Sequence, residues 1–126
     1  LQIVKPADTQ QAEARIRKIH AGLKHITPDT ATFLYLAKRG ISVLPDADCY
    51  EHPKLDYWED GVKTGTYPAM VSVFRTPVGE VSTLHITYLT KDGEKAPVPT
   101  DKKILPVMRP LVAAHVIKLA QTEFPL

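Results

Sequence analysis

The side chains with the clearest spacing for metal chemistry are a thiol and an imidazole near the middle of the chain, Cys49 and His52. Such a pair can supply two of the four ligands that a closed zinc site needs, and the other two usually come from a second pair. The other histidines, at positions 20, 25, 85 and 115, form no matching pair. The spacing therefore favours a small buried cysteine over a zinc site.

Two carboxylates, Asp46 and Asp48, lie just before this pair. On an extended chain their side chains point the same way, so their oxygens could bind a magnesium ion. No partner glutamate follows another strand to complete such a site. A solvated acidic loop is therefore the better interpretation of the pair.

Motifs for catalysis by this chain alone are missing. The sequence contains no GxGxxG turn, no GxxxxGK[ST] phosphate loop and no GxSxG nucleophile elbow. Cys49 has no histidine placed to activate it as a nucleophile. An independent small enzyme is therefore the interpretation that ranks last.

One histidine lies on a strand-like segment, EVSTLHITYL. Alternation places His85 on the face opposite Leu84 and Ile86, where an imidazole can meet solvent or a ligand. A plain surface histidine beside threonines has the same spacing, and spacing alone favours it.

Three lysines flank a proline-rich segment: Lys95, Lys102 and Lys103. Flexible lysines near a sheet edge suit phosphate contacts, and they also keep an edge strand soluble, so both interpretations stay open. The adjacent rings of Tyr57 and Trp58 could stack on bases or could fasten a long loop to the core.

Two helices are predicted in the first third of the chain. Asp8 can cap a helix over roughly 8–21, and Gly22 suits its end. A second helix is predicted to begin at Thr27 and to end before Gly40. The short connection between the two predicts a helical hairpin.

Strand patterns follow from residue 41 onward. Segments 69–75 and 80–89 predict a β-hairpin, and further strands are predicted at 103–105 and 113–119. Residues 45–68 hold three prolines and six acidic side chains, which predicts mostly loop with a short strand near 49–52. The fold class expected is α+β, with an N-terminal helical hairpin packed on a mostly antiparallel sheet, in a single domain over 1–126.

Composition fits a globular protein, with 44% hydrophobic and 24% charged residues. No apolar run reaches the roughly 20 residues that span a bilayer, no secretory signal opens the chain, and the single cysteine favours a reducing, cytoplasmic location. The formal net charge is only +2, although basic residues concentrate in 5–39 and 91–118 and acidic ones in 46–60. Charge alone favours a mixed, solvated surface over a basic binding face.

The segment TFLYLAKRGI (32–41) resembles the YLxxRGI signature near the start of the polymerase core in bacterial-type primases. The segments HPKLDYW, YPAMV, GEVSTLHITYLTKDGEKAPV and KKIL then follow in the order found in phage and plasmid primases and primase-helicases. No single motif is decisive, but the ordered match runs over about residues 28–120.

In that family a zinc-binding domain usually precedes this region, and a Toprim domain with magnesium-binding carboxylates follows it. The resemblance therefore implies a fragment of a DNA primase or primase-helicase, a nucleotidyltransferase of DNA replication, that lacks its catalytic half. The fragment would hold no cofactor and catalyse nothing alone; magnesium would belong to Toprim and zinc to the zinc-binding domain. Its partners would be single-stranded DNA template, nucleotides, and the Toprim and helicase domains of the parent protein, with no membrane.

The resemblance also implies a set of residues that contact nucleic acid or nucleotide: Lys38, Arg39, His85, Lys95, Lys102 and Lys103. Arg39 could instead cap the helix end or form an ion pair. Many relatives carry arginine where this chain has Ile86, which removes one expected positive charge. The competing interpretation is a structural interdomain module that makes no contact with nucleic acid.

Overall fold

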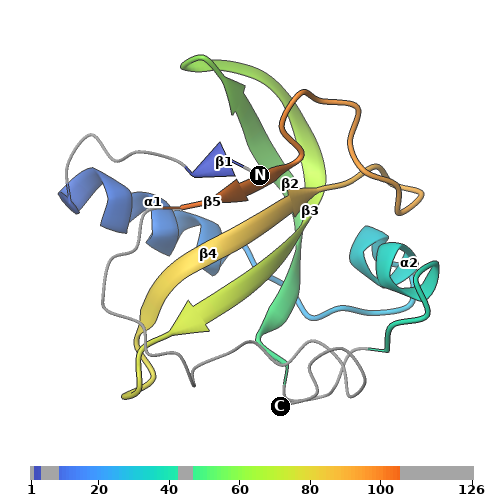
Figure 1. The fold of residues 1–126 in the computed structure, drawn as a ribbon, viewed down its shortest axis with the longest axis horizontal. Helices are drawn as coiled ribbons and strands as arrows, with labels where there is room; N and C mark the ends of the chain where they lie inside the picture. Colours follow the sequence, from blue (N-terminus) through green and yellow to red (C-terminus); the bar gives the residue numbers. More distant parts are fainter. Residues whose placement is uncertain (1, 4–8, 43–46, 106–126) are drawn as a thin grey trace.

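A computed structural model describes residues 2–3, 9–42 and 47–105 of the chain (Figure 1). Its elements, in chain order, are β1 (Gln2–Ile3), α1 (Thr9–Ala21), α2 (Ala31–Ala37), β2 (Cys49–Glu59), β3 (Val62–Arg75), β4 (Val81–Tyr88) and β5 (Lys102–Ile104). The strands form one sheet in the order β1-β5-β4-β3-β2, in which every pair is antiparallel except β1 with β5. The predicted α+β class, with N-terminal helices on a mostly antiparallel sheet, is confirmed.

Alternation along β3 and β4 gives the sheet two different faces. The face that we call the core face carries Ala69, Val71, Val73, Leu84, Ile86 and Tyr88. The face that we call the second face carries Met70, Ser72, Phe74, Thr83, His85 and Thr87. The core face is therefore apolar and the second face mostly polar, as strand periodicity requires for a sheet with one principal core.

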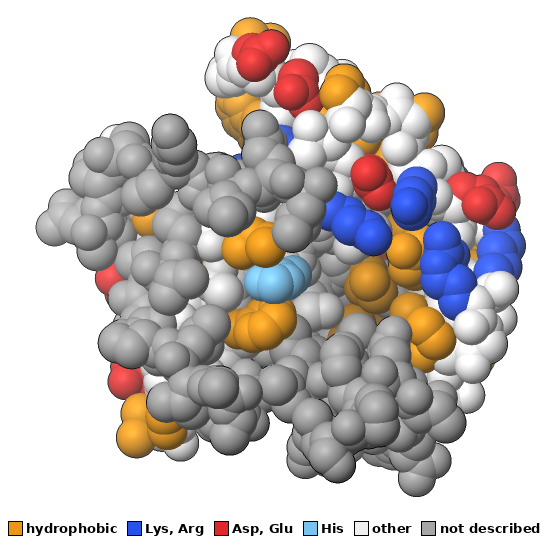
Figure 2. Space-filling view, in the orientation of Figure 1, with side chains coloured by type: hydrophobic (Ala, Val, Ile, Leu, Met, Phe, Trp, Pro, Cys, Tyr) orange, Lys and Arg blue, Asp and Glu red, His pale blue; other side chains and the backbone are white. Residues whose placement is uncertain are grey.

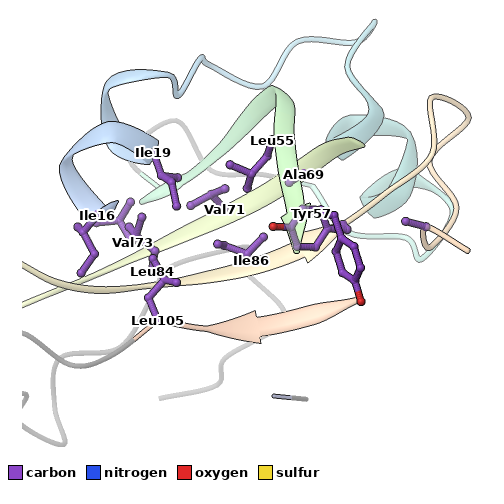
Figure 3. Packing of buried hydrophobic residues seen from close by; sticks show 12 residues of the cluster. Ile16, Ile19, Leu55, Tyr57, Ala69, Val71, Val73, Leu84, Ile86 and Leu105 are labelled. Atoms are coloured by element: carbon purple, nitrogen blue, oxygen red, sulfur yellow. The ribbon is translucent and has the colours of Figure 1, made fainter. Parts of the chain in front are cut away.

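Helix α1 covers the core face. Its buried residues Ala12, Ile16 and Ile19 follow the predicted helical stripe, and Ile16 and Ile19 pack with the sheet residues of the core. Figure 3 shows Ile16 and Ile19 lying over the strand β3, which carries Val71 and Val73. Full burial of each large aliphatic side chain contributes about 1.5–3 kcal/mol, so this contact fixes the position of the helix.

Helix α2 packs on the second face instead. Tyr35 and Leu36 form a separate small cluster with Leu89, and Met70 packs against it. The connection between the helices passes the edge strand β2, where Lys24 and Glu51 exchange backbone hydrogen bonds of 2.8 and 2.9 Å. The two helices therefore pack on opposite faces of the sheet and lie well apart in Figure 1, so they do not pack together as the predicted hairpin.

The second helix begins later than predicted. Thr30, in extended conformation, is its N-cap and accepts a hydrogen bond from the Phe33 amide at 3.2 Å. Thr27 lies one turn earlier, and its carbonyl accepts the Thr30 amide at 2.9 Å. Both threonines satisfy the sequence pattern for a cap, and the backbone conformation at Thr30 decides between them.

The prediction of mostly loop over 45–68 is wrong, because β2 and β3 form a long hairpin there. Pro53 lies at a register shift between His52 and Leu55 in an edge strand, where a missing amide hydrogen is tolerated. The turn is Asp60-Gly61, and both residues have positive φ (51° and 77°), as a two-residue hairpin turn requires. That dipeptide is a recognised hairpin signal, and the acidic and proline-rich composition around it concealed the strands.

The other strand predictions divide into tested and untested ones. The hairpin of 69–75 with 80–89 is confirmed by the β3–β4 register, and the strand at 103–105 by β5. Residues 113–119 lie outside the described residues. Within the described ranges, neither helix has the length and apolarity that crossing a bilayer requires.

Candidate nucleic-acid interface

The end of α2 brings the signature residues to the turn that follows β4. Lys38, the C-cap, donates a hydrogen bond of 2.7 Å from Nζ to the Asp92 carbonyl and forms an ion pair of 2.5 Å with Glu94. The hydrogen bond and charge of Lys38 lower the pKa of the Glu94 carboxyl below its usual value. Lys38 and Glu94 are distant in the sequence, and the contact joins two of the motifs on which the family resemblance depends.

Arg39 contacts the last turns of α2. Its guanidinium lies 3.8 Å from the centre of the Tyr35 ring and donates a hydrogen bond of 3.2 Å to the Tyr35 carbonyl. The structure therefore shows the helix-capping role that the sequence left open. Arg39 stays exposed to solvent, so the cation also remains available to an anionic ligand.

Three further candidates lie on the same side as α2. Lys95 is exposed and pairs across a bridge with Leu89, next to Glu94. Lys102 of β5 is paired with Thr87 of the second face, which also carries His85. We call Lys38, Arg39, His85, Lys95 and Lys102 the second-face group. Figure 2 shows Lys and Arg side chains gathering on the side of the view where α2 and the start of β5 lie.

His85 is a half-buried member of this group. Its ring lies against Phe74, with ring centres 4.0 Å apart and planes inclined by 31°. Burial lowers the pKa of the imidazole below its ordinary 6.5, so His85 is neutral at neutral pH. It can exchange hydrogen bonds with a ligand there but does not add a positive charge.

Lys103 is the one predicted residue that the sheet separates from the others. It pairs with Ile86 on the core face and is 4% exposed. Its ammonium donates a hydrogen bond to the Trp58 carbonyl and lies 4.3 Å from the centre of the Tyr57 ring. Burial lowers the pKa of Lys103. His85 and Lys103 lie on opposite faces of the sheet, and one groove cannot hold both.

A cleft of about 950 Å³ lies on the core-face side, between α1 and the β2–β3 hairpin. Its lining includes Arg15, Lys18, His52, Lys54, Trp58 and Lys103. Sequence reasoning missed Arg15, Lys18 and Lys54 as site residues. The signal that could have found the first two is their spacing of three on one helix, which makes them surface neighbours.

The possible metal ligands of the sequence do not come together. Cys49 pairs with Ser72 on the second face, whereas His52 pairs with Ala69 on the core face, so the two cannot share an ion. Asp48 forms an ion pair of 2.9 Å with Arg75, and Asp46 lies outside the described residues. Within the parts of the chain that the structure describes, no group of three metal-binding side chains is found.

Comparison with known proteins adds a family. No curated protein and no solved structure matches the chain. One protein family does match it over residues 10–116, a range that contains every predicted site residue. The match covers most of the 126 residues, and the chain therefore belongs to the family described as domain of unknown function (DUF7146).

Proposed function

We propose that this domain acts in DNA replication as the part of a primase or primase-helicase that lies beside the Toprim domain. Its role there is to form a wall that holds single-stranded template and nucleotides. The observation that carries the proposal is the second-face group, in which motifs from distant parts of the sequence meet. The signature residue Lys38 contacts Glu94 in the turn after β4, Arg39 follows Lys38 in the chain, and Lys95 follows Glu94.

The chemistry of this group suits phosphate. Lysine and arginine side chains position a nucleic-acid backbone without reading its sequence, and they release counterions when they neutralise phosphates. A template wall needs contacts of this kind and no nucleophile. In this proposal nucleotidyl transfer belongs to the Toprim domain of the parent protein, and this domain orients the strand.

A second candidate function has its own support. Lys38 is already paired with Glu94, and Arg39 already lies on Tyr35, so both cations have structural roles within the domain. Val62 and Val78 are 61% and 80% exposed, as expected for side chains that another domain could cover. These contacts favour a structural interdomain module that binds no nucleic acid.

Fluorescence anisotropy with single-stranded DNA separates the two functions. We expect the 126-residue chain to bind at low salt and to weaken as salt rises. Lys95→Glu and Lys102→Glu should each weaken binding at least fivefold, and each lost phosphate contact should reduce the salt slope by about 0.7. The matched control is Lys24→Glu, an exposed lysine in the connection between the helices.

Two results would contradict the template role. One is an absence of binding at low salt by a chain that circular dichroism shows to be folded, which would favour the interdomain module. The other is an equal loss for Lys24→Glu, which would reduce the binding to general charge attraction.

A further inference from the structure

The cleft between α1 and the β2–β3 hairpin has cationic walls. Arg15 and Lys18 come from α1, and Lys54 comes from β2 on the other side. None of the ion pairs among the described residues involves these three side chains. Two carboxylates, Asp56 and Asp60, also line the cleft, and Lys63 pairs with Asp56 at 3.2 Å. With Lys103, the cationic side chains that line the cleft outnumber its carboxylates.

The floor of the cleft adds to this charge. Lys103 lies there with its ammonium held by the Trp58 carbonyl. Burial is the main cause that lowers the pKa of Lys103, the negative charge of Glu59 raises this pKa, and the positive charge of Arg15 lowers it. Arg15 and Glu59 are thus both close enough to Lys103 to act on its charge, and Lys103 brings a further cation to the cleft.

Trp58 provides the aromatic part of the site. Its side chain is 41% exposed at the cleft, whereas its neighbour Tyr57 is 1% exposed in the core. Lys103 donates a hydrogen bond to the Trp58 carbonyl. This contact fixes the backbone from which the indole side chain extends. An exposed, anchored indole beside cationic side chains is the combination that single-stranded nucleic-acid sites use to stack a base and hold its phosphate.

From these observations we propose that the cleft binds a nucleoside phosphate, with its phosphate between Arg15, Lys18 and Lys54 and its base on Trp58. The volume of about 950 Å³ suits a ligand of this size. The inference deepens the proposed function and depends on it for the class of ligand, but it lies on the opposite face of the sheet from the second-face group. The nucleotide could be free or part of a strand.

Trp58 is the only tryptophan of the chain, so its fluorescence reports on this cleft alone. We expect thymidine monophosphate or a short thymidine oligonucleotide to quench the emission in a saturable way. Inorganic tripolyphosphate, which has no base, should leave the emission unquenched and compete with the nucleotide. Quenching by the free nucleotide identifies a nucleotide pocket, whereas quenching by the oligonucleotide alone identifies a passage for a strand.

Charge-reversal variants test the cationic walls. Lys18→Glu and Lys54→Glu should each raise the ligand concentration for half-maximal quenching at least fivefold. Lys91→Glu, an exposed lysine in the turn after β4, should leave it unchanged. Equal effects of all three changes would overturn the site, as would a folded protein whose Trp58 emission responds to neither nucleotide nor oligonucleotide.

The same titrations distinguish this inference from the proposed function. If anisotropy shows strand binding that Lys102→Glu weakens, while the Trp58 emission does not change, the cleft inference fails and the proposed template role is supported. If Trp58 is quenched and the Lys102→Glu change has no effect on anisotropy, the cleft site stands and the second-face group loses its role.

Discussion

At the scale of single residues, Glu51 connects the sheet to a short helix. Its side chain is buried, with 6% of its surface exposed. The carboxylate accepts hydrogen bonds from the Thr32 hydroxyl at 2.6 Å, from the Thr32 amide at 2.9 Å and from the Ala31 amide at 3.3 Å. It thereby satisfies amides of the first turn of α2 and places a negative charge at the positive end of the helix.

Removing this carboxylate should destabilise the fold strongly. We expect Glu51→Ala to lower the free energy of unfolding by about 3 kcal/mol, because two amides and a hydroxyl lose a charged, buried partner. Urea denaturation followed by circular dichroism measures the change. Glu94→Ala is the matched control, since that carboxylate is exposed and its ion pair with Lys38 is screened by water. Similar denaturation midpoints for the two variants would contradict the assignment.

At the scale of elements, α2 and the turn after β4 fit closely together. Gly93 in that turn has φ of +79°, and a Cβ atom there would lie 2.6 Å from Leu34 Cβ and 2.7 Å from the Tyr35 amide nitrogen. Gly40, at the end of α2, has a similar φ of +71°, but a Cβ atom there would meet nothing within 4 Å. Substitutions at the two glycines therefore distinguish the effect of backbone strain on stability from the effect of close packing.

Alanine at each position should have a different cost. Gly40→Ala should lower the free energy of unfolding by about 1–2 kcal/mol, because only the left-handed conformation is unfavourable for alanine. Gly93→Ala should have the same backbone effect, and its Cβ atom must also push the helix away from the turn, which lowers the free energy of unfolding by about a further 1–3 kcal/mol. Thermal or urea unfolding of both variants provides the comparison. Equal decreases in the free energy of unfolding would show that α2 does not pack closely on this turn. The close packing that brings Lys38 to Glu94 would then be contradicted.

At the scale of the whole molecule, each face of the described part of the sheet holds one histidine whose pKa is lowered by burial. His52 lies on the core-face side and His85 on the second face, and burial lowers the pKa of each below the ordinary 6.5. The Nδ1 atom of His52 is buried without a hydrogen-bond partner among the described residues. Both imidazoles therefore bind a proton less readily in the folded chain than in the unfolded one.

This difference should make the fold sensitive to mild acid. Because the unfolded chain binds more protons, the free energy of unfolding falls as the pH drops below the unfolded pKa of 6.5. We expect urea midpoints to decrease on crossing that pH, and we expect His85→Phe, which can stack on Phe74, to remove part of the decrease. A pH dependence that is the same in the variant and the parent would rule out His85 as a cause.

The sequence by itself determined the local parts of this protein. Apolar spacing along 8–21 marked the side of the helix that Ile16 and Ile19 bury, and alternation put Leu84 and His85 on opposite faces of a strand. Gly40 marked the end of the second helix, where it has positive φ. Such features have periods of a few residues, so the local pattern is enough to specify them.

Only the tertiary structure decided which distant segments meet. Helix α2 lies on the second face because Tyr35 and Leu36 find Leu89 there, a contact across more than fifty positions. The β2–β3 hairpin stays extended because each strand supplies the hydrogen bonds of the other, despite a composition typical of loops. The sheet that results separates Lys103 from the second-face group and brings it into the cleft with Trp58. Burial and pairing between distant residues carry no local period, and for that reason they become visible only in the folded chain.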